Sequence, residues 1–151
     1  MTPEITSEAR MERLEQLVQF VARHAEAAGF PIRRIKEIEL ATEEVLVNIV
    51  SYAYPDNEGP VSIQCWADNA ARLVLEISDN GVPFNLLDVP DPDVTARFSD
   101  RQVGGLGIFF VKQMADEARY RREGDRNILM LSFDRHRQDS KGRGYAGTVQ
   151  K

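Results

Sequence analysis

Glu44 and Asn48 lie four residues apart in a segment with helical periodicity, and both carry side-chain oxygens. At roughly 100° per residue they are about 40° apart on a helix, at the edge of its apolar stripe. Magnesium prefers oxygen ligands and keeps several waters, so the amide oxygen of Asn48 suffices together with nucleotide phosphates and waters. Glu44 could orient or deprotonate a nucleophile beside the terminal phosphate. The ordinary alternative is a pair of solvated helix residues, because acidic side chains are mostly exposed.

Asp79-Asn80-Gly81 closes an apolar run that predicts a β-strand. A carboxylate held there can accept a hydrogen bond from an exocyclic amino group such as that of adenine, and Gly81 lets the backbone approach the ring. The same three residues are also a common turn. This motif alone therefore leaves both interpretations open.

Gly104-Gly105-Leu106-Gly107 opens a segment with helical periodicity. Clustered glycines at a helix start expose backbone N–H groups to an anion, and Arg97 or Arg101 could add charge to bind the phosphates. A Rossmann fingerprint needs a strand directly before the glycines and an acid about twenty residues later, and the chain does not fit that pattern. A flexible linker that caps a helix is the alternative.

Two helices are expected at the start of the chain, before any strand. The first covers about 7–28, with Ser7 as its cap and Gly29 as its stop. The second runs from Pro31 to about Ala53 and carries the first motif. Its apolar stripe is predicted to contain Ile38, Ala41, Val45, Ile49 and Tyr52.

Two hairpins and a third helix are expected in the rest of the chain. Alternation over 61–67 and 72–78 predicts the first hairpin, and 118–122 with 127–133 the second. Between them lie an aperiodic segment rich in Pro and Asp, which we interpret as a lid, and a helix over about 105–117. We therefore predict an α+β fold, a two-layer α/β sandwich with a mixed, mostly antiparallel sheet and helices on one face.

Length and composition limit the classes of function. The chain has 151 residues, the length of one domain, and we assign residues 1–136 to it and 137–151 to a disordered tail. A net charge of −5 without a basic stripe argues against nucleic acid. No apolar run is long enough for a signal peptide or membrane span, so a cytoplasmic protein is expected. Cys65 has no cysteine partner and is expected to fill the core.

The order of the three motifs corresponds to the N, G1 and G2 boxes of one divided ATP site, and the resemblance covers about 7–133. The chain resembles the Bergerat-fold (GHKL) ATPases, the superfamily of gyrase and the histidine kinases. Within that superfamily, the segments 39–50 and 104–112 resemble the bacterial anti-sigma-factor serine/threonine kinases.

This resemblance implies a protein that binds ATP and Mg²⁺, typically as a homodimer. It would phosphorylate a STAS-domain anti-anti-sigma antagonist and regulate a sigma factor by partner switching. By position, Asn48 resembles the magnesium ligand and Glu44 the catalytic carboxylate. The nucleotide contacts would come from Asn48, Asp79, Gly81, Arg101, Gly104, Gly105, Leu106 and Gly107.

Two departures from the family pattern leave other functions open. Val103 stands where the family often has a basic residue, and Asp125-Arg126-Asn127 stands near the place of a Gly-Thr pair that helps bind the adenine-reading Asp. One alternative is a nucleotide-gated protein-binding regulator without kinase activity. Another is an interaction domain that keeps only the fold.

Overall fold

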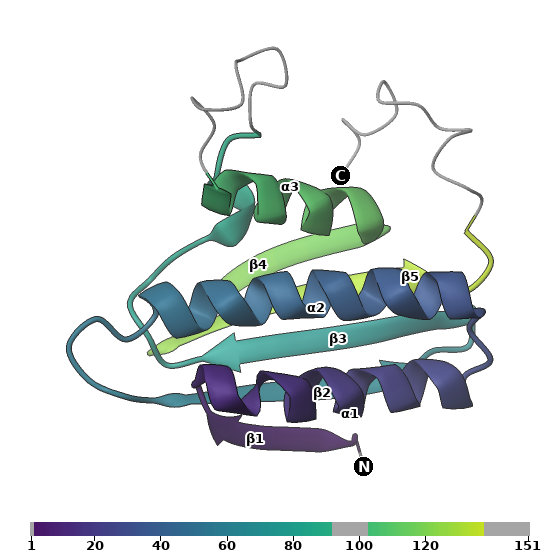
Figure 1. Cartoon of the computed structure of the whole chain (residues 1–151), viewed down its shortest axis with the longest axis horizontal. Coiled ribbons are helices and arrows are strands. Elements are labelled where there is room, and N and C mark those ends of the chain that lie inside the picture. The colour runs from purple at the N-terminus through teal and green to yellow at the C-terminus, as the bar shows by residue number, and fades with distance from the viewer. Residues whose placement is uncertain (1, 92–102, 138–151) are drawn as a thin grey trace.

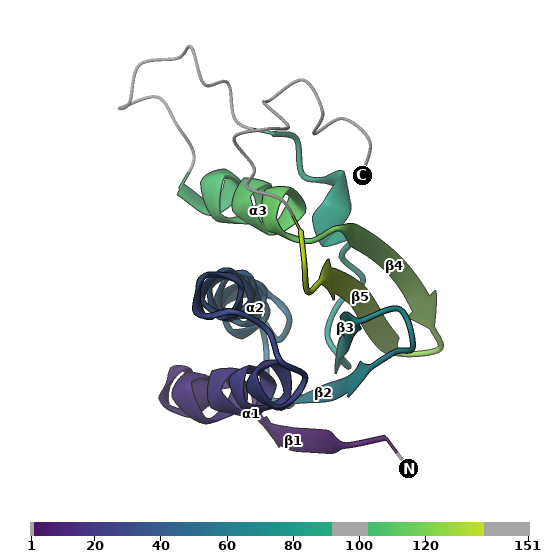
Figure 2. The same ribbon diagram turned by 90° about the vertical axis from the view of Figure 1, so that its right-hand side faces the viewer.

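A five-stranded sheet in the order β1-β2-β3-β5-β4 forms one layer of the molecule, and three helices lie on one side of it (Figures 1 and 2). The computed structural model describes residues 2–91 and 103–137, with residues 103–106 described in their backbone alone. All strand pairs are antiparallel. The α+β sandwich is thus confirmed, whereas the mixed sheet was wrong for the described strands.

The chain begins with a strand rather than a helix. β1 (Glu4–Glu8) pairs with β2 (Pro60–Ala67), so that Ser7 lies opposite Val61 in the sheet and does not cap a helix. The 3₁₀ turn η1 (Met11–Arg13) follows, and α1 (Leu14–Ala27) starts seven residues later than expected from Ser7. The prediction was wrong for the first turns of this helix. Half-buried and exposed side chains alternate over 4–8, as in a β-strand, and the strand is completed by pairing with a segment far along the chain.

The two long helices follow the predicted pattern more closely. Gly29, with a φ of 84°, ends α1, because that left-handed conformation strains other residues. α2 (Ile32–Tyr52) carries the expected apolar stripe except at its end, where Tyr52 is 61% exposed. Tyr52, which we expected to be a core or partner-facing aromatic, therefore does not lie in the core.

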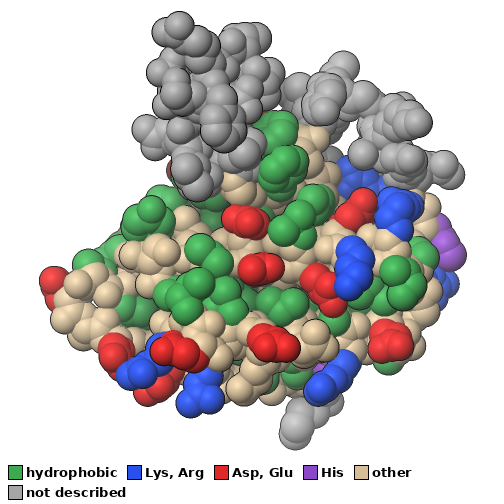
Figure 3. Space-filling model, viewed as in Figure 1, with side chains coloured by type: hydrophobic (Ala, Val, Ile, Leu, Met, Phe, Trp, Pro, Cys, Tyr) green, Lys and Arg blue, Asp and Glu red, His purple; other side chains and the backbone are tan. Residues whose placement is uncertain are grey.

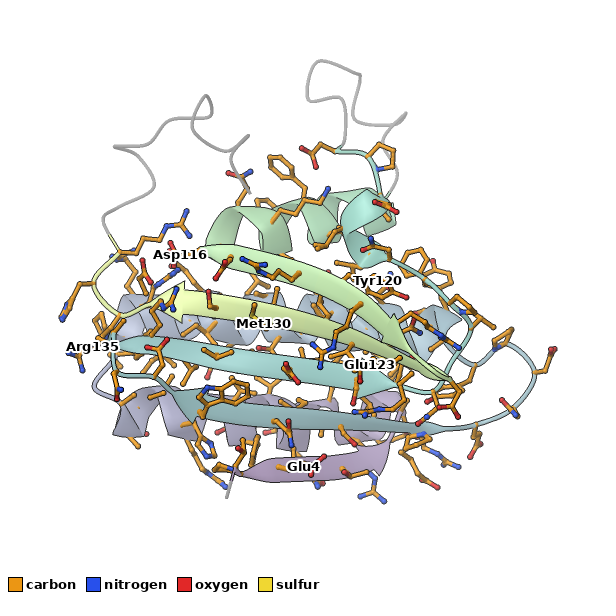
Figure 4. The ribbon with its side chains drawn as sticks, turned by 180° about the vertical axis from the view of Figure 1, so that it is seen from behind. Glu4, Asp116, Tyr120, Glu123, Met130 and Arg135 are labelled. Atoms are coloured by element: carbon orange, nitrogen blue, oxygen red, sulfur yellow. The ribbon has the colours of Figure 1, made fainter. Side chains whose placement is uncertain are left out.

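The two sheet faces differ in character. The core lies between the sheet and the helices, and Cys65 is fully buried there as predicted. The outer surface of the helix layer mixes acidic and hydrophobic side chains (Figure 3). No described helix covers the opposite face of the sheet, where Glu123 of β4 and Met130 of β5 lie (Figure 4). This face is partly solvated, as expected from the order of the elements.

Two hairpins bring the ends of β3 and β5 together. β2 turns into β3 (Arg72–Asp79), and β4 (Glu117–Glu123) turns into β5 (Arg126–Asp134), both as predicted. β3 pairs directly with β5, so that Asp79 lies opposite Asn127. Segments almost fifty residues apart in sequence thus meet at one end of the sheet.

α3 (Val103–Met114) precedes β4, and the short 3₁₀ turn η2 (Leu86–Asp88) lies before the segment that we interpreted as a lid. The helix ends earlier than predicted, because Glu117 already belongs to β4. Residues 92–102, which include most of that lid, lie outside the described residues. None of the helices in the described part of the chain combines the length and apolar character needed to cross a membrane.

Arg34 fixes the C-terminal end of α3 against the rest of the domain. Its buried guanidinium donates to the carbonyl oxygens of Met114 at 2.9 Å and Asp134 at 3.0 Å, and it also pairs with Asp116. Arg137 donates to the same Met114 carbonyl at 2.5 Å. The folded part therefore includes Arg137, one residue beyond the predicted boundary, and the tail over 138–151 lies outside the described residues.

Candidate functional site

A pocket of about 430 Å³, part of it open to solvent, lies between the C-terminal half of α2 and the ends of β3 and β5. It brings together two of the predicted site residues, Asn48 and Asp79, which come from different layers of the fold. Most of its other lining residues are apolar or aromatic, which suits a planar ring. The pocket is lined by Val45, Asn48, Ile49, Tyr52, Ala53, Ile77, Asp79, Val82, Phe84, Leu86, Tyr120, Asn127 and Leu129.

Asp79 is the charged residue of this pocket, and it is only 6% exposed. Its Oδ1 accepts hydrogen bonds from the backbone N–H of Gly81 at 2.8 Å and from Nδ2 of Asn127 at 2.9 Å. Among the described residues, none donates to Oδ2. One carboxylate oxygen is therefore held by the protein and the other is available to a ligand that carries an N–H group.

Asn127 is a site residue that sequence reasoning missed. Its Nδ2 donates to Asp79 and to the carbonyl oxygen of Val82, each at 2.9 Å. Its Oδ1 accepts from the Tyr120 hydroxyl at 2.6 Å, from Arg122 Nη1 at 3.1 Å and from the Phe84 N–H at 3.2 Å.

These bonds use both ends of the Asn127 amide, so its orientation is fixed. The sequence, which lacks the Gly-Thr pair of the family, did not identify the residue that binds Asp79. In the structure this residue is Asn127. A polar residue directly before the apolar run 128–131 was the available signal. The signal could be used only once the pairing of β3 with β5 was known.

Gly81 lets the end of α2 touch the turn that follows β3. A Cβ at this position would overlap the carbonyl oxygen of Ala53 and would lie 2.6 Å from the Ala53 Cβ. The contact is completed by a hydrogen bond of 2.9 Å from the Val82 N–H to the Ala53 carbonyl. Gly81 therefore serves close packing of the site, in addition to any direct approach to a ligand.

Asn48 and Glu44 follow each other on α2 but differ in their surroundings. Asn48 is half-buried and lines the pocket, and no described residue forms a hydrogen bond with its side-chain amide. Its amide oxygen suits a hard cation that takes its remaining ligands from phosphates and water. Groups of three or more His, Cys, Asp or Glu side chains that could hold a metal are absent from the described residues.

Glu44 lies outside the lining of the pocket, against α3. A Cβ added to Gly107 would overlap Oε1 of Glu44 and would lie 2.9 Å from its Cδ. Burial, and secondarily the charge of Glu43, raises the pKa of the Glu44 carboxyl. A partly desolvated carboxyl with a raised pKa is a candidate general base.

The glycine-rich segment forms the start of α3, two residues earlier than predicted. Gly104, Gly105 and Leu106 lie in its first turn, and Gly107 follows on the side of α2. Lys112 on the same helix donates to the Val89 carbonyl at 2.9 Å and pairs with Asp91. Arg101 lies outside the described residues.

Comparisons with known proteins agree with this architecture. The family model of the histidine kinase-like ATPase domain matches residues 7–133. The chain therefore belongs to the family of histidine kinase-like ATPase domains. Among solved structures, the histidine kinase domain of the blue-light activated histidine kinase EL346 from Erythrobacter litoralis matches with a TM-score of 0.52 and 16% identity. The match covers 93% of this chain but 64% of that one, so it supports the fold alone.

Two similar curated proteins are serine-protein kinases. RsbW of Listeria monocytogenes is 24% identical over 119 residues, which cover 76% of this chain and 75% of the relative. RsbW of Bacillus cereus (strain AH187) is 26% identical over 118 residues, which cover 76% and 73%. The chain is thus a distant relative of these kinases.

Proposed function

We propose that the protein is an ATP-dependent serine/threonine protein kinase that acts on a STAS-domain antagonist and regulates a sigma factor by partner switching. The observation that carries this proposal is the position of Asn48 and Asp79 in one pocket, with Glu44 one helical turn from Asn48. The serine-protein kinases among its relatives support the same reaction class.

The adenine ring would occupy the apolar part of the pocket. Oδ2 of Asp79 would accept a hydrogen bond from the 6-amino group, while Oδ1 stays bound to Gly81 and Asn127. Because an ionised carboxylate accepts hydrogen bonds and does not donate them, this arrangement favours adenine over a base with an oxo group at the same place.

The phosphates would extend from the pocket toward the start of α3. The side-chain oxygen of Asn48 would hold a magnesium ion, which neutralises developing phosphate charge when it is bound. Backbone N–H groups at Gly104 and Gly105 in the first turn of α3, together with Arg101, would bind phosphate oxygens. The substrate hydroxyl oxygen would attack the terminal phosphorus, the bond from that phosphorus to the bridging oxygen would break, and ADP would leave. Glu44 would accept the proton of the hydroxyl, and the raised pKa of this carboxyl suits that role.

The decisive experiment compares two neighbouring carboxylates. Glu44→Gln and Glu43→Gln each replace one glutamate of α2, but only Glu44 contacts α3, while Glu43 is exposed. Purified variants are incubated with labelled ATP, Mg²⁺ and a STAS-domain protein that copurifies with the wild-type protein from its native organism. Transfer to serine or threonine should fall at least a hundredfold in Glu44→Gln and stay within twofold in Glu43→Gln. ATP binding should persist in both.

A nucleotide-gated regulator without kinase activity is the second candidate, and Val103 favours it, because this apolar residue stands where the kinases that the chain resembles often have a basic one. In that case ATP changes the affinity for the partner protein and no phosphate is transferred. Wild-type protein that binds ATP yet leaves the partner unlabelled would establish this candidate over the kinase. Protein that binds no ATP at all would contradict both.

A further inference from the structure

The turn that carries Asp79 is attached to α2 by the hydroxyl group of Tyr54. This hydroxyl donates to the carbonyl oxygen of Pro60 at 2.5 Å and accepts from the backbone N–H of Asn80 at 2.7 Å. It therefore joins the end of α2, the start of β2 and the turn after β3. We call this group of contacts the Tyr54 clasp.

The clasp completes a set of bonds around the peptide of Gly81. Three successive backbone N–H groups have partners: that of Asn80 donates to Tyr54, that of Gly81 to Oδ1 of Asp79, and that of Val82 to the carbonyl of Ala53. The first and third bonds go to Tyr54 and Ala53, two consecutive residues that directly follow α2. The second bond orients the Asp79 carboxylate. Movement of the Asn80 peptide would therefore rotate the carboxylate of Asp79.

The Tyr54 ring is itself held in place. A Cβ at Gly59 would overlap the ring and would lie 2.7 Å from its Cδ1, so the loop after α2 packs tightly on one ring face. Burial also raises the pKa of the phenol, which keeps it protonated and able to donate over the physiological range. An immobile ring with a protonated hydroxyl can fix the turn in one position.

The structure assigns Tyr54 as a positioning residue for base recognition: its hydroxyl holds the Asp79 turn at a set distance from Asn48. Asn48 lies on α2, six residues before Tyr54, which follows directly after the C-terminal cap Ala53 of that helix. The clasp thus connects the element that would hold the phosphates and metal to the element that would read the base. This inference rests on the proposed nucleotide binding, but it concerns a residue outside the pocket lining.

The test measures recognition of a single amino group. Dissociation constants for ATP and for purine riboside triphosphate, which lacks only the 6-amino group, are determined by calorimetry with Mg²⁺. Wild-type protein should prefer ATP by about tenfold or more, as expected for a hydrogen bond to a carboxylate. In Tyr54→Phe this preference should fall to about threefold or less, because the ring remains while Asp79 loses its fixed position.

A matched control separates positioning from general loss of stability. Ile38→Val removes one buried methyl group from α2, far from the pocket lining, and destabilises the protein by a similar amount. Any loss of affinity in Ile38→Val should be equal for ATP and purine riboside triphosphate, so that the preference for ATP stays unchanged. Urea unfolding of both variants verifies that they are folded under the binding conditions.

Each outcome decides the matter. A reduced preference in Tyr54→Phe, together with an unchanged preference in Ile38→Val, supports the assignment. An unchanged preference, whether or not both affinities fall, overturns it. Wild-type protein that binds ATP without preference contradicts base reading by Asp79 and the clasp together, and wild-type protein that binds no nucleotide overturns the proposed function itself.

Discussion

Replacing Gly107 with alanine should have two effects, a more stable α3 and a displaced Glu44 side chain. The added Cβ would overlap Oε1 of Glu44, which is the far end of a flexible side chain. No backbone atom stands in the way among the nearest neighbours of that Cβ. The helices can therefore stay in place while the Glu44 side chain turns away.

Two opposing contributions set the expected change in the free energy of unfolding. Gly107 is the fifth residue of a twelve-residue helix, where alanine is more stable than glycine by about 1 kcal/mol. Forcing Glu44 out of its present side-chain conformation costs about 0.5–1.5 kcal/mol. Gly107→Ala alone should thus change stability by less than about 0.5 kcal/mol, because the two contributions nearly cancel.

A double-mutant cycle with Glu44→Ala isolates the contact. In the Glu44→Ala background the obstructing carboxyl is absent, so Gly107→Ala should stabilise the protein by the full amount of about 1 kcal/mol. Urea unfolding of the four proteins, followed by circular dichroism, measures this coupling. In the Glu44-containing protein, phosphate transfer should also decrease, since the carboxylate is displaced. Equal effects of Gly107→Ala in both backgrounds would refute the inferred contact between Glu44 and α3.

Four further results are expected. Asn127→Leu should destabilise the protein by about 2–4 kcal/mol in urea unfolding, because the Tyr120 hydroxyl and other buried groups lose their partner. It should also abolish nucleotide binding. A neutral effect on both would contradict the role of Asn127 as the partner of Asp79. Arg34→Met should cost about 3–5 kcal/mol, since a fully buried ion-paired group is removed, and a change below about 1 kcal/mol would be inconsistent with that burial. The pKa of Glu44 is higher in the folded protein than in the unfolded chain. The contribution of Glu44 to the free energy of unfolding is therefore fully present below the pKa of the unfolded chain, and it is lost as the pH rises through the pKa of the folded protein. Glu44→Gln should therefore gain stability relative to wild type over that rise, and a pH-independent difference between the two would count against it. Burial raises the pKa of Cys65 to about 12, so the thiol should stay unmodified by DTNB in native protein and react fully in urea, whereas rapid native labelling would show that the core opens.

The sequence predicted the helices and hairpins where local periodicity and packing agree. α2 and the two hairpins were located within one or two residues, because their apolar spacing matches one period and their ends carry turn residues. The predicted first helix was wrong at its start. β1 is stabilised by its pairing with β2, more than fifty residues later, and such pairing leaves only a weak local pattern.

Asn48 and Asp79, which the structure places in one pocket, were predicted from their residue types and their order in the chain. The contact of Gly107 with Glu44 and the fit of Gly81 against Ala53 were not accessible. Both depend on how closely two helices, or a helix and a turn, approach each other. Distances between elements follow from packing of the whole core, which local residue patterns do not encode.

The sequence by itself thus determined the class of protein, because the three motifs occur in the order that one ATP-binding domain requires. Only the tertiary structure decided which residues complete the site. Asn127 becomes the partner of Asp79 because β5 pairs with β3 in the register that places the two opposite each other. Tyr54 reaches the same turn because α2 ends beside it. The physical reason is that hydrogen bonds between distant segments form only after the sheet register and helix packing have been fixed.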